Sequence, residues 1–490
     1  MKVLSKSSPA DLAIALIPIA FLIFALWFNV GNVFGDAALD GSNQIILLFA
    51  AGLTVALGMV RGIKFKRFTK DISQNIGDTT KPILIILLIG ALAGTWMISG
   101  VVPAMIYYGL QVLSASYFLA ASLIICALVS LATGSSWGTT ATVGIALMGM
   151  GRAMGMNEAM VAGAIISGAY FGDKMSPLSD TTNLAPAMAG GDLFTHIRYM
   201  FLTTAPSVLI ALGIFIVIGL NLDAASISLN PDELLANISS VFNISPWLFL
   251  VPALVIFLIA RKVDALIAIF AGVLAGGVFA IIFQPQIIAE LAQNGGSLFH
   301  QNYEAVMRAI YGDVAIKTDD PILAELFSSG GMAGMLNTIW LIVAALTFGG
   351  TLEAAGFLRI IMNAITKLAK STFSLIASTV GTCLFLNVTA SDQYLALVVP
   401  GRMFKDLYKE RGLAPENLSR SLEDSGTVTS VLVPWNTCGA FQSGVLGVAT
   451  GDFWMYCFFN IISPIMTLIF AFFNIKIKHL PAPKIADTPS

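Results

Sequence analysis

The sequence predicts an all-helical polytopic membrane protein, and its composition is the first reason. Hydrophobic residues make up 57% of the 490 residues and charged residues only 11%, whereas a soluble domain carries about 25% charged residues. About eleven to thirteen apolar segments, counting short and interrupted ones, approach the roughly 20 residues that a helical span needs. Open β-structure is excluded as the spanning element, because its unpaired backbone groups would face lipid.

Charge and residue counts exclude several classes of function. The net charge of −2 provides no basic surface for nucleic acid. Four scattered cysteines without a C-x-x-C pair, and only three histidines, indicate neither a disulfide framework nor a zinc site. The sequence contains no H-E-x-x-H or G-x-S-x-G motif. We therefore expect neither an enzyme nor a protein with a resident cofactor.

The distribution of Lys and Arg predicts the orientation in the membrane. The basic segments 61–70 and 402–420 should be cytoplasmic, as should Arg261 and Lys262. The loops 31–43 and 221–246, which carry acids such as Asp36, Asp40 and Asp223 but no base, should be external, as should the acidic stretch 284–333. Both termini are then expected in the cytoplasm.

The two halves of the chain share a pattern. The motif G-T-x4-G at 94–100 recurs at 350–356, an offset of 256, and the same offset places Thr133–Ser136 on Thr389–Asp392. About seven crossings separate the copies, and an odd number inverts the second copy, as in many secondary transporters. We predict five parts: a two-helix segment 1–80, a first repeat 81–222, connecting helices and an external loop 223–333, a second, inverted repeat 334–478, and a cytoplasmic tail 479–490.

Four segments bring polar residues to membrane depth, at 133–144, 171–187, 387–394 and 423–440. Their glycines and prolines predict broken or re-entrant helices, tolerable only around a cavity or inside packed protein. Hydroxyl, amide, carboxylate and carbonyl oxygens suit hard cations such as Na⁺. A carboxylate in a membrane is costly, about 2.5–3.5 kcal/mol at a helix centre, and can hold a proton or a cation but not both comfortably. That competition is the simplest chemistry for proton-coupled cation exchange.

Each acid also has a purely structural interpretation. Asp180 could cap a short helix, and Asp392 could serve only the break in which it lies. Asp192 and Asp452 lie in matching Gly-Asp turns typical of helix caps. Exposed or salt-bridged acids are common. Asp173 could form an interfacial ion pair with Lys174, and either Glu423 or Asp424 could be solvated or salt-bridged.

Two long motifs resemble one family of transporters. GDKMSPLSDTTNLAPA (172–187) and EDSGTVTSVLVPWNTCG (423–439) look like the NhaC family of Na⁺/H⁺ antiporters, and GSSWGT (134–139) and TASDQY (389–394) fit the same resemblance. It spans most of the chain and implies a bacterial inner-membrane transporter that exports Na⁺ in exchange for H⁺ by alternating access, a role in pH homeostasis. Similar sequences include malate/lactate exchangers coupled to Na⁺ and H⁺. A small organic acid as substrate, Li⁺ as a second cation and a homodimer therefore stay open as alternatives.

On this interpretation the transported ions meet in the broken segments. Asp180 and Asp392 are the expected ion- or proton-carrying carboxylates. Other oxygens around the cation are expected from Ser135, Ser136, Thr139, Thr182, Asn183, Asn436 and Thr437. The expected charge partners are Asp173, Lys174, Glu423 and Asp424. In the organic-acid alternative, Lys174 or helix N-termini would bind the anion.

Overall fold

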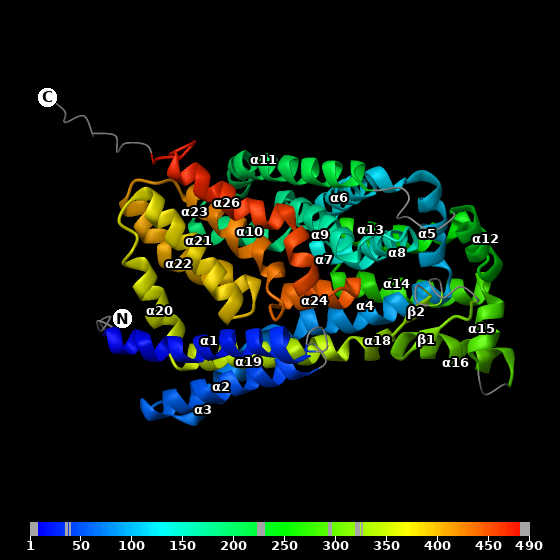
Figure 1. Cartoon of the computed structure of the whole chain (residues 1–490), viewed down its shortest axis with the longest axis horizontal. Helices are drawn as coiled ribbons and strands as arrows, with labels where there is room; N and C mark the ends of the chain where they lie inside the picture. Colours follow the sequence, from blue (N-terminus) through cyan, green and yellow to red (C-terminus); the bar gives the residue numbers. More distant parts are fainter. Residues whose placement is uncertain are drawn as a thin grey trace.

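The structure, a computed structural model, is a bundle whose long helices mostly run along the long axis of the molecule (Figure 1). It describes residues 8–34, 38, 41–222, 231–292, 296–318, 324 and 327–480. Among these, the only paired strands are the two-residue β1 (Val314–Ala315) and β2 (Ser328–Ser329). The predicted all-helical architecture is confirmed. Asp36, Asp40, Asp223 and the end of the tail, 481–490, lie outside the described residues.

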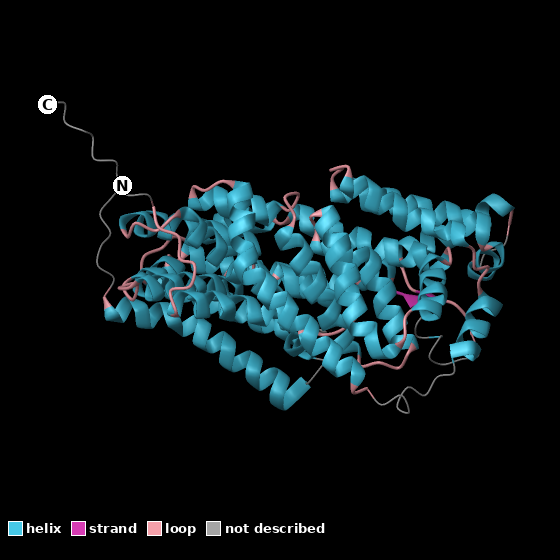
Figure 2. Ribbon diagram, turned by 90° about the horizontal axis from the view of Figure 1, so that it is seen from above, coloured by secondary structure: helices cyan, strands magenta, loops and turns pink. Residues whose placement is uncertain are grey.

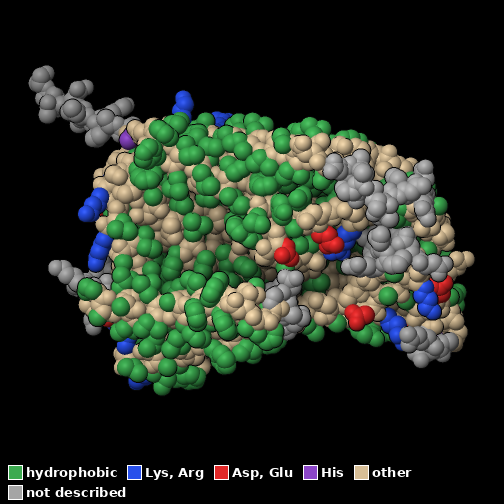
Figure 3. Space-filling view, in the orientation of Figure 1, with side chains coloured by type: hydrophobic (Ala, Val, Ile, Leu, Met, Phe, Trp, Pro, Cys, Tyr) green, Lys and Arg blue, Asp and Glu red, His purple; other side chains and the backbone are tan. Residues whose placement is uncertain are grey.

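The helices have the length and surface of membrane spans. Within the described part of the chain, eight helices are long and apolar enough to cross a membrane, or up to ten if each of two bent pairs is one span. The bent pairs are Leu234–Val241 with Pro246–Ala260, at 84°, and Thr450–Tyr456 with Phe458–Phe472, at 56°. Hydrophobic side chains cover most of the middle of the visible face (Figure 3). The protein is therefore a polytopic membrane protein, and its other apolar segments are short or interrupted helices.

The N-terminal segment contains three helices rather than two. They are α1 (Pro9–Phe28), continued by a π-helical stretch η1 (Asn29–Phe34), then α2 (Ser42–Val60) and α3 (Phe65–Asp78). Ser8 and Asp11 form a capping box at the start of α1. Helix α3 contains Lys66, Arg67 and Lys70, and it packs with α2 against α19 (Leu336–Ala354).

Two runs of similar helices follow, although the second run contains more short helical turns than the first. The first run is α4 (Thr80–Ile98), α5 (Val101–Val112), α6 (Ala115–Thr133), α7 (Ser136–Thr139), η3 (Thr140–Gly144), α8 (Ile145–Ala153), α9 (Glu158–Met175), α10 (Asp180–Ala189) and α11 (Leu193–Leu220). The second run is α19, α20 (Phe357–Thr366), α21 (Thr372–Thr389), α22 (Gln393–Glu410), α23 (Pro415–Leu422), η6 (Glu423–Thr427), η7 (Ser430–Leu432), α24 (Thr437–Leu446), α25 (Thr450–Phe453), η8 (Trp454–Tyr456) and α26 (Phe458–Phe472). Gly100 and Gly356, which the motif aligns, both precede the second helix of a run with a positive φ, 77° and 72°.

The connecting region lies at one end of the molecule. It comprises α12 (Pro231–Val241), η5 (Pro246–Phe249), α13 (Leu250–Ala260), α14 (Ala265–Phe283), α15 (Pro285–Leu291), α16 (Leu298–Tyr311) and α18 (Gly331–Gly334). Helices α12, α15 and α16 gather at the right of Figure 1, whereas α20, α22, α23 and both chain ends lie at the left. We call the left end, where α22 ends and α23 begins, the basic end, because Lys409 and Arg411 lie at the end of α22 and Lys478 pairs with Glu416 of α23. Figure 2, the view from above, also shows both chain ends on this side.

Candidate ion-binding site

In both runs the chain breaks at the same point, directly after the third helix, which is α6 in the first run and α21 in the second. After α6, Gly134 has a φ of 70° and Ser135 is extended, and α7 begins at Ser136. After α21, Ser391 has a φ of 61° and Asp392 is the extended cap of α22. The caps therefore match at an offset of 257, so the structural counterpart of Asp392 is Ser135 and not Ser136, as the offset of 256 suggested.

A second interruption also recurs. Ser179 caps α10, which begins at Asp180, and Asn436 caps α24, which begins at Thr437. The offset is again 257, so Asp180 corresponds to Thr437. At the first helical residue or cap of these breaks each run thus carries one acid, but at a different break: the first run has Asp180 at its second break, and the second run has Asp392 at its first.

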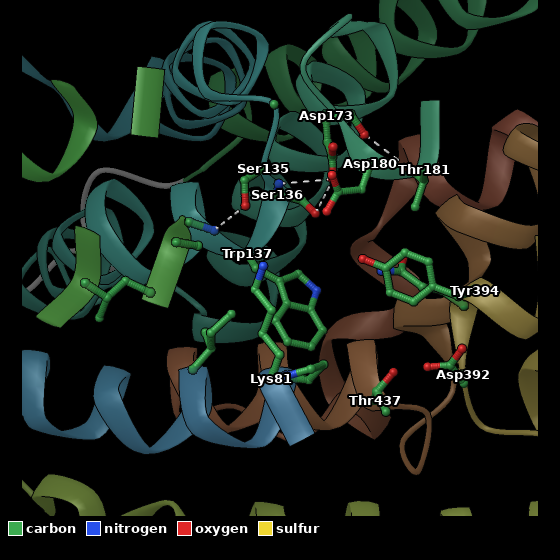
Figure 4. A pocket seen from close by; sticks show the side chains of 18 of the residues that line it. Lys81, Ser135, Ser136, Trp137, Asp173, Asp180, Thr181, Asp392, Tyr394 and Thr437 are labelled. Carbon is green, nitrogen blue, oxygen red and sulfur yellow. Dashed lines mark hydrogen bonds between the residues drawn. The ribbon is translucent and has the colours of Figure 1, made fainter. Parts of the chain in front are cut away.

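All four breaks meet at one cavity of about 320 Å³ (Figure 4). It is lined by Asp78, Lys81, Pro82, Ile85, Gly134, Ser135, Ser136, Trp137, Gly138, Asp173, Ser179, Asp180, Thr181, Ala265, Ile269, Asp392, Gln393, Tyr394 and Thr437. The lining has four carboxyl groups against one ammonium group. Within the described residues, no three His, Cys, Asp or Glu side chains are placed to hold one metal ion together. The acids therefore surround a space without converging on a single point.

Asp173 closes the first break. It accepts hydrogen bonds from the backbone N–H of Ser136, at 3.1 Å, and from the Ser136 hydroxyl, at 2.6 Å. These bonds, drawn in Figure 4, fix the start of α7 against α9. The carboxylate is buried at the N-terminus of α7.

The two predicted carboxylates lie differently in the cavity. Asp180 is exposed on the first turn of α10, and Ser179, not Asp180, is the cap of that helix. Asp392 caps α22 by accepting a hydrogen bond from the backbone N–H of Leu395, at 3.0 Å. Asp392 therefore has a structural role as a helix cap, but it does not serve the break alone, because it also lines the cavity.

Of the seven other predicted oxygen ligands, Ser135, Ser136 and Thr437 line the cavity and four do not. The hydroxyl of Thr182 donates to the carbonyl of Lys174, at 3.0 Å, and the amide of Asn183 donates to that of Ser179, at 2.7 Å. The amide of Asn436 donates to the carbonyl of Asn387, at 3.0 Å. These three side chains stabilise the broken backbone. Thr139 is buried outside the lining.

The predicted charge partners divide between two places. Asp173 lines the cavity, but Lys174, the next residue, points elsewhere and forms a fully buried ion pair with Asp424. The expectation of an Asp173–Lys174 pair is wrong: neighbouring residues on a helix point about 100° apart. The alternative expectation, that Asp424 is a salt-bridged acid, is confirmed. Asp424 also accepts hydrogen bonds from Thr467 and, at 2.8 Å, from Thr203.

The helix-cap prediction holds for one of the two Gly-Asp turns. Asp192 caps α11 by accepting a hydrogen bond from the backbone N–H of Thr195, at 2.9 Å. Asp452 lies inside the short helix α25, and the residue at the cap position is Ala449.

Several lining residues escaped the sequence analysis, among them Trp137, Tyr394, Asp78 and Lys81. Trp137 and Tyr394 stand inside the motifs GSSWGT and TASDQY, so aromatic residues next to the predicted ligands were the available signal. Trp137 stacks on Phe441 of α24, with ring centroids 3.9 Å apart and an interplanar angle of 16°. Asp78 and Lys81 come from the α3–α4 junction, where the sequence has no signal for the site.

Lys81 marks the mouth of the cavity. Its ammonium is 2.7 Å from the carboxylate of Asp264, and their side chains are 55% and 43% exposed. Asp264 directly follows the loop that contains Arg261 and Lys262. The cavity therefore opens to the surface beside a loop whose charge predicts the cytoplasmic side.

Comparison with known proteins assigns a family. The model of the Na⁺/H⁺ antiporter family matches residues 168–475. The chain is 37% identical to the Na⁺/H⁺ antiporter NhaC of Alkalihalophilus pseudofirmus, over 81% of this chain and 83% of that one. It is 34% identical to the malate-2H⁺/Na⁺-lactate antiporter of Bacillus subtilis (92% of each chain). It is 33% identical to the arginine/ornithine antiporter ArcD of Halobacterium salinarum (94% and 91%). The chain belongs to the NhaC family of Na⁺/H⁺ antiporters and is a multi-pass secondary transporter, not an enzyme.

Proposed function

We propose that this transporter exchanges Na⁺ for H⁺ across a bacterial inner membrane by alternating access, with the cation bound in the central cavity. The observation that carries the proposal is the lining: four carboxyl groups, several hydroxyl groups and one ammonium group surround a space built from the breaks of both runs. Such hard oxygen ligands suit Na⁺ better than a soft metal. Broken helices around a central site are the usual architecture of secondary transporters.

The two predicted carboxylates and the helix ends have opposite effects on a cation. Asp180 and Asp392 attract it, and Ser135 and Thr437, which occupy the matching positions of the other run, offer hydroxyl oxygens. The N-termini of the helices that start at these breaks carry positive partial charge. That charge weakens cation binding, as a site that must also release its ion requires. A proton on either carboxyl would remove one of the attractive charges.

The accessible mouth supports a cycle between two states. With Lys81 and Asp264 partly exposed at its rim, the cavity is open on one side, beside the 261–264 loop. We assign this state to cytoplasmic access. Cytoplasmic Na⁺ would enter here, and movement of the broken helices would expose the same cavity to the other side.

A second candidate is exchange of a small organic molecule together with Na⁺ and H⁺. The cavity of about 320 Å³ is larger than a bare ion needs and falls at the lower end of the range of about 300–1,000 Å³ of small-molecule sites. Two relatives are named as exchangers of organic acids or amino acids. Lys174, the expected anion ligand, is engaged with Asp424 outside the cavity. A carboxylate substrate would instead meet Lys81, the cationic side chain of the lining, and would have to compete with Asp264 for it.

Transport by purified protein in liposomes with a trapped pH dye separates the two candidates. Na⁺, Li⁺, K⁺, malate, lactate and arginine are added in turn. We expect Na⁺ alone to drive proton movement. Proton movement that needs an organic substrate in addition would favour the second candidate. No proton movement with any cation, whether an organic substrate is present or not, would contradict both.

A further inference from the structure

A polar helix leads from the basic end of the molecule into its centre. In α23 and η6, Glu416, Asn417, Ser419, Arg420, Ser421, Glu423, Asp424, Ser425 and Thr427 are all buried. Helices α10, α11, α21, α22 and α26 pack around this segment. A surface helix would turn its polar residues to water, and a core helix would be apolar all round. Polar residues on every side of a buried helix therefore require another explanation.

The neighbouring acids Glu423 and Asp424 are in opposite situations. Asp424 is held by the ammonium of Lys174 and by the hydroxyls of Thr203 and Thr467. Glu423 is equally buried, but neither of its carboxyl oxygens has a hydrogen-bond partner. A buried carboxylate without a partner is costly, whereas a neutral carboxylic acid is much less so. The structure thus surrounds Asp424 with a cation and hydroxyl donors and leaves Glu423 without either in direct contact, which suits a neutral side chain.

One turn earlier, Arg420 is a second buried charged side chain without a hydrogen-bond partner. Its side chain is fully buried, and three guanidinium nitrogens have no hydrogen-bond partner. Its guanidinium carbon lies 4.6 Å from the ring centroid of Tyr199 and 5.9 Å from that of Phe470. Both protonation states of Glu423 have support: the neutral form from burial without a hydrogen-bond partner, the charged form from Lys174.

The backbone marks the same place. Glu423–Thr427 is a π-helical turn, whereas the matching residues of the first run, at the offset of 257, lie within the regular helix α9. Single π-turns often occur at functional sites. Glu423 lies eight residues beyond Pro415, roughly 12 Å along the helix from the basic end. The hydroxyl of Thr427, one turn on, is the group that can donate to it.

We propose that Glu423 is a proton-binding site separate from the central cavity, which equilibrates with the basic end along α23. This inference rests on the proposed function for its role in transport but not for the existence of the site. Glu423 is outside the cavity lining, so Na⁺ bound there does not compete directly for this proton. Lys174 connects the two places, because it faces Glu423 and adjoins Asp173 in the cavity wall.

The charged and titratable groups around Glu423 define what its proton responds to. Helix α9 contributes Asp173 and Lys174, α21 contributes Cys383, and η6 contributes Asp424. Helix α26 has no ionisable side chain, and α10 has only Asp180, at its cavity end. On α22 the ionisable residues are Tyr394, near its start, and those from Arg402 onward. Ala396 and Leu397, which lie between them, contact η6.

Infrared difference spectroscopy of the purified protein tests the site directly. In saturating Na⁺ we expect a band from a protonated carboxylic acid that disappears as the pH rises. The band should be absent in Glu423→Gln, retained at a shifted frequency in Glu423→Asp, and unchanged in Glu416→Gln. Glu416→Gln is the matched control, since Glu416 stands on the same helix but is paired with Lys478 at the basic end. Persistence of the band in Glu423→Gln, or its removal by Na⁺ in the wild type, would overturn the proposal.

Na⁺ self-exchange tests the consequence for transport. With saturating Na⁺ on both sides of membrane vesicles, protons are displaced from the cavity, and any remaining pH dependence comes from other groups. We expect the wild type and Glu416→Gln to respond to pH on the basic side only, and Glu423→Gln to be flat. A pH-independent wild type, or an unchanged profile in Glu423→Gln, would contradict the proposal. A wild type that moves no Na⁺ would instead refute the proposed function, and the infrared band would still decide on Glu423.

Discussion

Lys174 of the first run and Asp424 of the second form an ion pair that is completely shielded from solvent. Ser463 joins them, since it accepts a hydrogen bond from the Lys174 ammonium at 3.0 Å and donates one to Asp424 at 3.3 Å. The pair therefore fastens α9 to η6 and to α26. Because Asp173 precedes Lys174, the same helix presents one side chain to the cavity and the next to this network.

Breaking the pair on one side should destabilise the protein more than removing it altogether. We expect Lys174→Met or Asp424→Asn alone to cost about 3–5 kcal/mol, because each leaves an uncompensated buried charge, and the double variant to cost less. Thermal unfolding in detergent, followed by size-exclusion chromatography, measures the three variants. Additive losses would mean that the two groups do not interact.

Asp180 and Asp392 should each be needed for cation binding in the cavity. Asp180→Asn and Asp392→Asn should raise the Kd for Na⁺ at least about tenfold, or about 1.4 kcal/mol, and abolish exchange. Asparagine keeps the size and can still cap a helix, as Asp392 does, but it cannot bind or release the proton. Asp192→Asn is the control, because Asp192 caps α11 outside the cavity. Normal exchange by both cavity variants would shift the assignment to Asp173 or Asp78.

The sequence predicted the broken segments well and the partners within them poorly. Asp180, Asp392 and Ser135 could be found because a polar residue beside a glycine or proline in an apolar span is unusual. The same motifs also contain Thr182, Asn183 and Asn436, and spacing alone cannot tell a side chain that faces a cavity from one that closes a broken backbone. The pairing of Lys174 with Asp424, 250 residues apart, and the approach of Lys81 depend on tertiary packing that no local pattern encodes.

The rim of the cavity should not titrate over the working range. A hydrogen bond from Lys81, with one from the backbone N–H of Leu266, holds the pKa of Asp264 below its usual value. A lowered pKa stabilises the fold above the unfolded value of about 3.9 and is lost as the pH falls through the folded value. The pair is partly exposed, so Asp264→Asn should cost less than about 1 kcal/mol, equally from about pH 5 to about pH 9. Unfolding temperatures across this range check the prediction, and a cost that grows toward the alkaline end would contradict it.

The two runs should have opposite orientations, with both termini in the cytoplasm. Basic residues gather at the end where the chain ends lie (Figure 3), and Ser239 lies on α12, near the opposite end (Figure 1). Single cysteines at Ser239 and Lys409, both exposed, can be probed with an impermeant reagent, since the four native cysteines are buried. We expect labelling of the Ser239 position from outside intact cells and of the Lys409 position only after permeabilisation. Equal labelling of both from outside would refute the topology.

The last prediction concerns competition between Na⁺ and H⁺ in the cavity. If one cavity carboxyl must lose its proton before Na⁺ binds, the apparent Kd for Na⁺ should rise about tenfold for each unit by which the pH falls below the pKa of the site. Above that pKa the affinity should level off, and turnover should fall for want of protons to carry back. Equilibrium binding of radioactive Na⁺ to the purified protein, from about pH 5 to about pH 9, measures the slope.

Variants separate this competition from the influence of Glu423. Glu423→Gln should keep the tenfold slope, because the competing carboxyl in the cavity is intact. Of Asp180→Asn and Asp392→Asn, the variant that removes the proton-exchanging carboxyl should flatten the slope. Asp192→Asn should leave it unchanged. An affinity independent of pH in the wild type would mean that proton and cation occupy separate sites throughout the cycle. The cavity would then be a cation site alone, and the exchanged proton would have to be assigned to a group outside it.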